Sequence, residues 1–175
     1  RPDGVCVVLD VGANVEANAS QLTEFAVLGE AYYRALYKVE HPTIGLLNVG
    51  TEDQKGNATI KAAHERLSQS HIGINYQGYV EGNDISFGNT DVVVTDGFTG
   101  NIALKTAEGT AKLIGKFFTE ALSGNIWSKF TTFLNGIALL KLKKRIDPRG
   151  VNGGVFLGLN GVVIKSHGGT DKIGY

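Results

Sequence analysis

The sequence predicts an α/β fold with a mostly parallel β-sheet between layers of helices. Short runs of β-branched and aliphatic residues alternate along almost the whole chain with longer segments of helical pattern, which is typical of βα units. The apolar runs lack a period of two, so their strands are expected to be covered on both faces. With 175 residues, 42% of them hydrophobic, we expect one α/β domain over residues 1–175.

The expected strands are short apolar runs rich in valine and isoleucine, which favour extended structure. In chain order they lie at residues 5–10 (VCVVLD), 43–49 (TIGLLNV), 74–80 (INYQGYV), 91–96 (DVVVTD) and 161–165 (GVVIK). Helical patterns follow the first, second and fourth runs, over residues 20–37, over residues 58–67 and from near Asn101.

Composition excludes several classes of protein. Basic and acidic residues balance at 17 each, so the net charge gives no reason to expect nucleic acid as a partner. Cys6 is the only cysteine, which excludes an intrachain disulfide, fits a reducing compartment and favours core packing. No long apolar run or leader sequence is readable, which predicts a soluble, cytoplasmic protein. No nucleotide motif and no cluster of histidines and cysteines occurs, so we expect no cofactor and no metal.

Glycine and small polar residues follow four of the expected strands, at residues 10–14, 48–57, 95–101 and 164–171. The carboxyl ends of parallel strands share one edge of an open sheet, where ligands bind, and glycines there allow backbone amides to approach an anion. Each loop alone is more typical of an ordinary turn, but four at one edge favour a site. We expect uncapped helix N-termini, with Lys55 and Lys105 beside them, to bind an oxyanion such as phosphate.

Four stretches carry a resemblance to a known family: LDVGANV, LLNVGTEDQKGN, DVVVTDGFTGNIALKTAEG and GVVIKSHGGTD. They resemble the phosphate acyltransferase family of bacterial phospholipid synthesis over nearly the whole chain. The resemblance implies a three-layer α/β/α sandwich, related to the phosphate acetyltransferases and to the isocitrate and isopropylmalate dehydrogenases. Members of the family are longer, so it also implies the C-terminal half of a longer chain, and the lack of any methionine points the same way.

By this resemblance the protein transfers a fatty acyl group from acyl carrier protein to inorganic phosphate, forming acyl phosphate. The active-site lysine and asparagine of the family fall on Lys55 of EDQKGN and Asn101 of GFTGN. Phosphate is itself a nucleophile, so the enzyme has to hold it and to stabilise the oxyanion that forms on the thioester carbonyl. Lys55 is expected to orient phosphate and Asn101 to donate to the carbonyl oxygen, although an asparagine there is equally typical of a helix N-cap.

Further loop residues are expected to complete the phosphate site. They are Asn14, Gly50, Thr51, Thr95, Asp96, Gly97, Thr99, Gly100 and His167. Asp96 would repel phosphate unless it orients a cation, and His167 is either a proton donor to the leaving thiolate or a surface histidine. Three other histidines have no predicted partner and are expected to face solvent: His41, His64 and His71.

A basic amphipathic helix is expected within residues 126–146. Large apolar residues recur there at helical spacing, and no acidic residue lies between Glu120 and Asp147. The residues expected to contact a membrane or carrier protein are Trp127, Phe130, Lys141, Lys143, Lys144 and Arg145. Such a helix suits an anionic membrane or an acidic carrier protein, but equally a core or a dimer interface. The family resemblance implies a homodimer that associates peripherally with the membrane.

Two rival functions stay open at the level of sequence. The first is a phosphate acetyl- or butyryltransferase that uses coenzyme A thioesters. The second is a membrane-binding module without catalysis, because half of the expected crevice would lie outside this chain. Assays with phosphate and each kind of thioester in turn discriminate among these functions.

Overall fold

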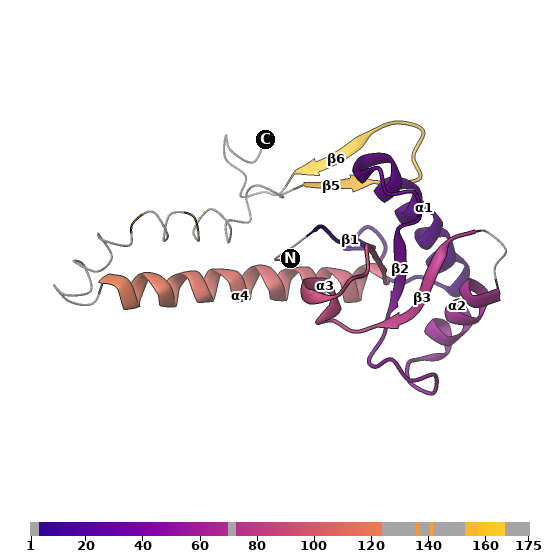
Figure 1. Ribbon diagram of the computed structural model, residues 1–175, viewed down its shortest axis with the longest axis horizontal. Coiled ribbons are helices and arrows are strands. Elements are labelled where there is room, and N and C mark those ends of the chain that lie inside the picture. Colours follow the sequence, from indigo (N-terminus) through magenta and orange to yellow (C-terminus); the bar gives the residue numbers. More distant parts are fainter. Residues whose placement is uncertain (1–3, 70–72, 124–135, 137–140, 142–152, 167–175) are drawn as a thin grey trace. The chain divides into compact units, whose positions relative to one another are not determined.

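Figure 1 shows the computed structural model, which describes residues 4–69, 73–123, 136, 141 and 153–166. The chain divides into two compact units, Arg1–Leu104 and Lys105–Tyr175. The segment 126–146 lies outside the described residues except for Gly136 and Lys141, of which Lys141 is exposed. No helix of the described residues is both long enough and apolar enough to cross a membrane.

A parallel four-stranded sheet forms the centre of the first unit. Its strands are β1 (Val7–Leu9), β2 (Thr43–Leu47), β3 (Asn75–Val80) and β4 (Val92–Val94), in the order β1-β4-β2-β3. Every neighbouring pair is parallel, and β4 lies between β1 and β2 with Val94 opposite Leu9 on one side and Leu46 on the other. The predicted parallel sheet and its first four strands are therefore confirmed, with each strand shorter than its apolar run.

Two long helices cover one face of this sheet. They are α1 (Ala19–Tyr37) and α2 (Ala58–Gln69), close to the predicted ranges. The core beneath them joins buried side chains such as Leu22 and Ala63 to Ile44 and Val92 of the strands. Gly29 lets α1 approach β4 closely, because a Cβ at that position would lie 2.6 Å from Val92 Cγ1.

The opposite face of the sheet carries a second, smaller core. Leu47, Val80 and Val93 are buried there, with Ile85 of the short helix α3 (Asp84–Phe87) and the half-buried Cys6 packed against them. Cys6 thus packs in the interior, as predicted. Apolar side chains on both faces of the strands explain why the runs lack a period of two, and this α/β arrangement is that of the predicted sandwich.

The helix N-termini differ from the sequence prediction. Asn18 caps α1 through a capping box with Gln21. The side chain of Asn57 accepts a hydrogen bond from Ile60 N (2.9 Å) at the start of α2, and Asp96 accepts one from Thr99 N (2.8 Å) at the start of α4 (Gly97–Ser123). The expectation of uncapped N-termini is therefore wrong for these three helices, because polar residues in the loops that follow the strands are themselves the caps.

The second unit contains the rest of α4 and a β-hairpin. The hairpin joins β5 (Gly153–Phe156) to β6 (Val163–Ser166) in antiparallel register, with Phe156 opposite Val163. The late strand predicted at 161–165 therefore forms slightly further along the chain. Its antiparallel partner was not predicted, because two glycines and a short apolar run are a weak strand signal.

Candidate functional site at the carboxyl edge of the sheet

Three of the four predicted loops meet at one edge of the first unit. Residues 10–14 follow β1, residues 95–101 follow β4 and residues 48–57 follow β2, and these three strands are neighbours in the parallel sheet. The 95–101 loop therefore lies between the other two. The fourth loop begins on β6 in the second unit, and His167 with the rest of that loop lies outside the described residues.

The 10–14 loop is organised by Asp10, a buried carboxylate that the sequence prediction missed. Asp10 Oδ1 accepts hydrogen bonds from Gly12 N and Ala13 N (both 2.8 Å), and Oδ2 accepts from Asn14 N (2.7 Å) and Asn14 Nδ2 (2.8 Å). Burial opposes ionisation of the carboxyl group, but the hydrogen bonds from Ala13, Asn14 and Gly12 outweigh burial and lower the pKa of Asp10. Asp10 is thus an ionised carboxylate at neutral pH.

This arrangement changes what the first glycine-rich loop does. Three consecutive backbone amides converge as in an anion-binding nest, but the anion they bind is the carboxylate of Asp10. Asn14 Nδ2 also donates to Asp10 Oδ2, so only the second N–H of that amide remains as a donor for the predicted contact with phosphate. The signal was present in LDVGAN, where an aspartate precedes a glycine and an asparagine at turn spacing.

The first turn of α4 packs directly on the 10–15 loop. A Cβ at Gly97 would lie 1.8 Å from the carbonyl oxygen of Asn14, and a Cβ at Gly100 would lie 1.9 Å from the carbonyl oxygen of Asp10. Phe98 N also donates to Val15 O at 3.2 Å. Both glycines are therefore required for the close approach of two backbones, whatever contact with phosphate they make.

Asn101 is exposed and stands beside the 10–14 loop. Its side chain faces Gly12, since a Cβ at Gly12 would lie 3.4 Å from Asn101 Cβ and 3.5 Å from Asn101 Oδ1. The helix starts at Gly97, so Asn101 is not its N-cap and that alternative is wrong. The cap is Asp96, whose carboxylate binds both the amide and the hydroxyl of Thr99, each at 2.8 Å. Thr95 is buried and extends the pairing of β4 with β1 through Asp10 N and Leu9 O.

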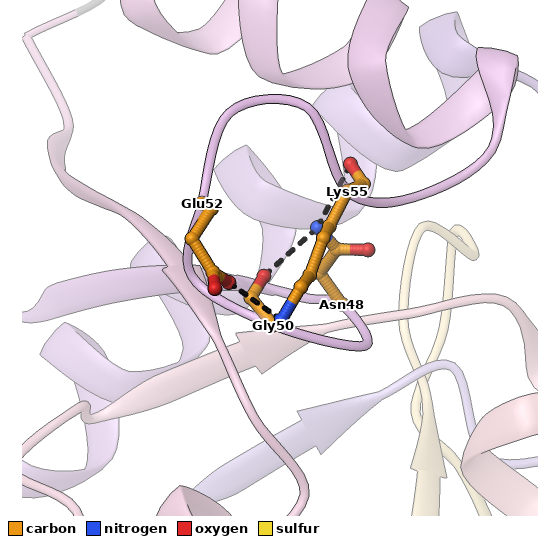
Figure 2. Close-up of polar contacts among 4 residues, drawn as sticks. All are labelled: Asn48, Gly50, Glu52 and Lys55. Carbon is orange, nitrogen blue, oxygen red and sulfur yellow. Dashed lines mark hydrogen bonds and ion pairs between the residues drawn. The ribbon is translucent and has the colours of Figure 1, made fainter.

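The 48–57 loop carries the predicted lysine. Figure 2 shows Asn48 Nδ2 donating to Gly50 O (3.0 Å) and Lys55 O (3.3 Å), which closes the loop around one side chain. Lys55 Nζ pairs with Glu52 Oε2 at 2.9 Å, and both side chains are about half exposed. The hydrogen bond and the charge of Glu52 raise the pKa of Lys55, so its ammonium group stays charged at neutral pH. Thr51 is exposed on the same loop.

A histidine–tyrosine cluster lies between α2 and β3. His64 Nδ1 is 2.8 Å from Tyr76 Oη, and its ring stacks on Tyr79 with centroids 4.3 Å apart. The expectation that His64 faces solvent without a partner is therefore wrong, because its helix face packs on the strand that follows. His41 is exposed as predicted, and His71 lies outside the described residues.

No group of three or more potential metal ligands occurs among residues 4–69, 73–123 and the other described positions. The predicted catalytic groups are the ammonium group of Lys55 and the exposed amide of Asn101, on loops that follow neighbouring strands at the carboxyl edge. A cation and an amide donor at the same edge of the sheet suit an anionic substrate and a reaction in which negative charge develops on oxygen.

Comparison with known proteins gives a consistent result. The profile of the family described as "Fatty acid synthesis protein" matches residues 2–175. A phosphate acyltransferase of Maricaulis maris is 56% identical over 175 residues, which is 99% of this chain and 50% of the relative. One of Paramagnetospirillum magneticum is 56% identical over 172 residues (98% and 49%), and one of Caulobacter vibrioides is 51% identical over 172 residues (98% and 48%). The chain spans about half the length of the curated relatives it matches.

Proposed function

Since the chain belongs to the fatty acid synthesis protein family, we propose that it supplies part of the active site of a phosphate acyltransferase. The reaction we propose transfers a fatty acyl group from acyl carrier protein to inorganic phosphate, forming acyl phosphate for phospholipid synthesis. The names of the relatives support acyl transfer to phosphate, and the carrier protein as donor rests on the resemblance of the sequence motifs. The observation that carries the proposal is that the Lys55 loop and the Asn101 turn follow neighbouring strands at one edge.

In the proposed reaction a phosphate oxygen attacks the thioester carbonyl carbon. The carbon–oxygen bond forms, a tetrahedral oxyanion develops, and the carbon–sulfur bond then breaks to release the thiolate. Lys55 binds and orients phosphate through its charged ammonium group, which pairs with Glu52 in this structure. Phosphate has to compete with the carboxylate of Glu52 for that group, and a half-exposed ion pair is weak enough to be displaced.

Asn101 has the role of the oxyanion donor in this proposal. Its amide is exposed at the edge and does not serve as the helix cap, so it is available to a substrate carbonyl. Donors of this kind act mainly in the transition state and contribute roughly 3–4 kcal/mol to its stability. We therefore expect Asn101→Ala to lower kcat by about 10²-fold or more with a nearly unchanged free energy of unfolding.

The test measures acyl phosphate formation by the full-length natural protein that contains this sequence. Acyl carrier protein and coenzyme A thioesters are supplied separately with phosphate, and Asn101→Ala is compared with the parent protein. Faster turnover of the coenzyme A thioester would assign the acetyl- or butyryltransferase reaction instead. Unchanged turnover in Asn101→Ala, together with a loss of thermal stability, would show that Asn101 is structural.

We also propose that the basic segment at 126–146 brings a homodimeric, cytoplasmic protein to an anionic membrane surface or to its carrier protein. The sequence supports this with an apolar stripe and uninterrupted positive charge. Each basic residue near an anionic surface contributes about 1 kcal/mol, which salt weakens. Replacing Lys141, Lys143, Lys144 and Arg145 by glutamine should release the protein from anionic vesicles, and raised salt should have the same effect on the parent protein.

The oligomeric state is measured on the same samples, because the apolar stripe also suits a dimer interface. The four charge substitutions leave that stripe intact, and Trp127 fluorescence reports whether the segment inserts. If the variant keeps both vesicle binding and carrier binding while the dimer persists, the basic face has no docking role.

A further inference from the structure

We propose that Asp10 is a positioning residue that fixes the side chain of Asn101 by holding the 10–15 loop against the first turn of α4. The inference rests on the proposed function, because it assigns Asp10 a part in the reaction only through Asn101. Asp10 is 7% exposed and lies directly after β1, at the same edge of the sheet as Asn101. It acts through the loop and needs no contact with phosphate or with the acyl group.

The carboxylate of Asp10 sets the shape of the loop. Among the described residues, the hydrogen bonds to this carboxylate come from residues 12–14, and the ion pairs do not include it. A carboxylate that accepts several amide hydrogen bonds is strongly stabilised in place. Without it, three backbone amides that donate to one carboxylate would lose their acceptor, and only the backbone contacts with α4 and Thr95 would still hold the loop.

The backbone of the same loop sets the position of α4. Asp10 N donates to Thr95 O at 2.8 Å, and the carbonyl oxygens of Asp10 and Asn14 fill the space where side chains at Gly100 and Gly97 would stand. A Cβ at Gly12, which has φ +115°, would lie 3.4 Å from Asn101 Cβ, so the loop backbone runs close to the side chain of Asn101. A change in loop curvature therefore moves the backbone beside Asn101, and displacements of about 1 Å can cost 10²-fold in rate.

The test uses Asp10→Ala and Asp10→Asn in the full-length natural protein that contains this sequence. Asp10→Asn keeps the shape but places an amide N–H₂ against two of the four donors. We expect both to lower kcat, by about 10- to 100-fold in Asp10→Ala, with KM for phosphate within about threefold of the parent value, because the Lys55 loop is untouched. Asp10→Ala vacates the nest, so added formate should restore kcat in a saturable way but should not rescue Asn101→Ala.

Asp91→Ala is the matched control. Asp91 is half-buried, whereas Asp10 is buried, but it too is a carboxylate that accepts a backbone hydrogen bond, from Thr43 N (2.8 Å), together with one from Thr43 Oγ1 (2.9 Å). It lies before β4, at the opposite edge of the sheet. We expect Asp91→Ala to lose stability without losing kcat. Equal losses of kcat in Asp10→Ala and Asp91→Ala, or an Asp10→Ala enzyme within about twofold of the parent, would overturn the inference.

Amide hydrogen exchange on the parent protein gives a readout that needs neither a variant nor activity. The amides of Gly12, Ala13 and Asn14 should be protected from exchange although these residues are exposed. Exchange at the rate of an unstructured peptide would overturn the inference even if neither Asp10 variant folds. If the parent protein forms no acyl phosphate, the proposed function fails, whereas protected loop amides that lose their protection in Asp10→Ala would still show that Asp10 organises the loop.

Discussion

Replacing glycine by alanine in α4 should lower the free energy of unfolding at one end of the helix and raise it further along. Gly97 and Gly100 touch backbone atoms of the 10–14 loop, whereas a Cβ at Gly109 would have no described atom within 4 Å. Alanine is favoured over glycine inside a helix by about 1 kcal/mol. At Gly109 only this term acts, so Gly109→Ala should raise the free energy of unfolding by about 0.5–1 kcal/mol.

At Gly100 the steric cost exceeds the gain in propensity. The added Cβ would lie 1.9 Å from Asp10 O, whereas ordinary carbon–oxygen contacts are near 3.3 Å, so backbone has to move by more than 1 Å. Overpacking costs roughly 1–3 kcal/mol, and the upper end applies because the hydrogen bonds of Asp10 hold the loop. After the gain in propensity is subtracted, Gly100→Ala should lower the free energy of unfolding by about 2 kcal/mol.

Urea unfolding of Gly97→Ala, Gly100→Ala and Gly109→Ala measures these changes side by side, with a common denaturant slope as the check for two-state behaviour. A Gly100→Ala protein that is as stable as the parent would refute the close packing of α4 on the loop. Equal effects at Gly100 and Gly109 would show that propensity alone explains the glycines.

Three further predictions concern single side chains. Lys55→Gln should raise KM for phosphate by about tenfold or more in steady-state assays, whereas Glu52→Gln, which keeps the cation and removes its competitor, should not raise it. The pKa of Asp10 is lower in the folded protein than in the unfolded chain, where it is about 3.9, so the ionised carboxylate stabilises the fold above that pH. This stabilisation should disappear as pH falls through the folded pKa, and acid titrations of Asp10→Asn should lack that loss. His64→Ala should cost about 1–3 kcal/mol in urea unfolding, because it leaves the Tyr76 hydroxyl without its partner, whereas the exposed His41→Ala should change stability by less than about 0.5 kcal/mol.

The elements that the sequence predicted well are those in which local pattern and tertiary packing agree. The apolar run at 91–96 became β4, and the helical pattern at 20–37 became α1 with one residue more. The start of α4 was misplaced to Asn101, because two glycines in its first turn oppose helix formation locally. Tertiary contact with the 10–14 loop reverses that preference, since only glycine fits between the two backbones.

The site was predictable where chain order alone brings residues together, and less so where packing decides. The carboxyl-edge position of the Lys55 and Asn101 loops follows from a parallel sheet. The role of Asp10 was readable in principle, but an aspartate that ends a strand is also an ordinary turn residue. The pairing of His64 with Tyr76 required knowing which face of α2 packs on β3, and periodicity does not give that.

The place of β4 in the sheet has a consequence for synthesis on the ribosome. About 45 residues separate the end of β2 from the start of β4, and at about 5–20 residues per second they take about 2–9 s to make. Until then β1 and β2 have no strand between them, and each exposes an unpaired edge that can recruit other chains. The four-stranded sheet and the edge that carries the site can therefore form only after β4 is made, and the same step removes the unpaired edges of β1 and β2 that face β4.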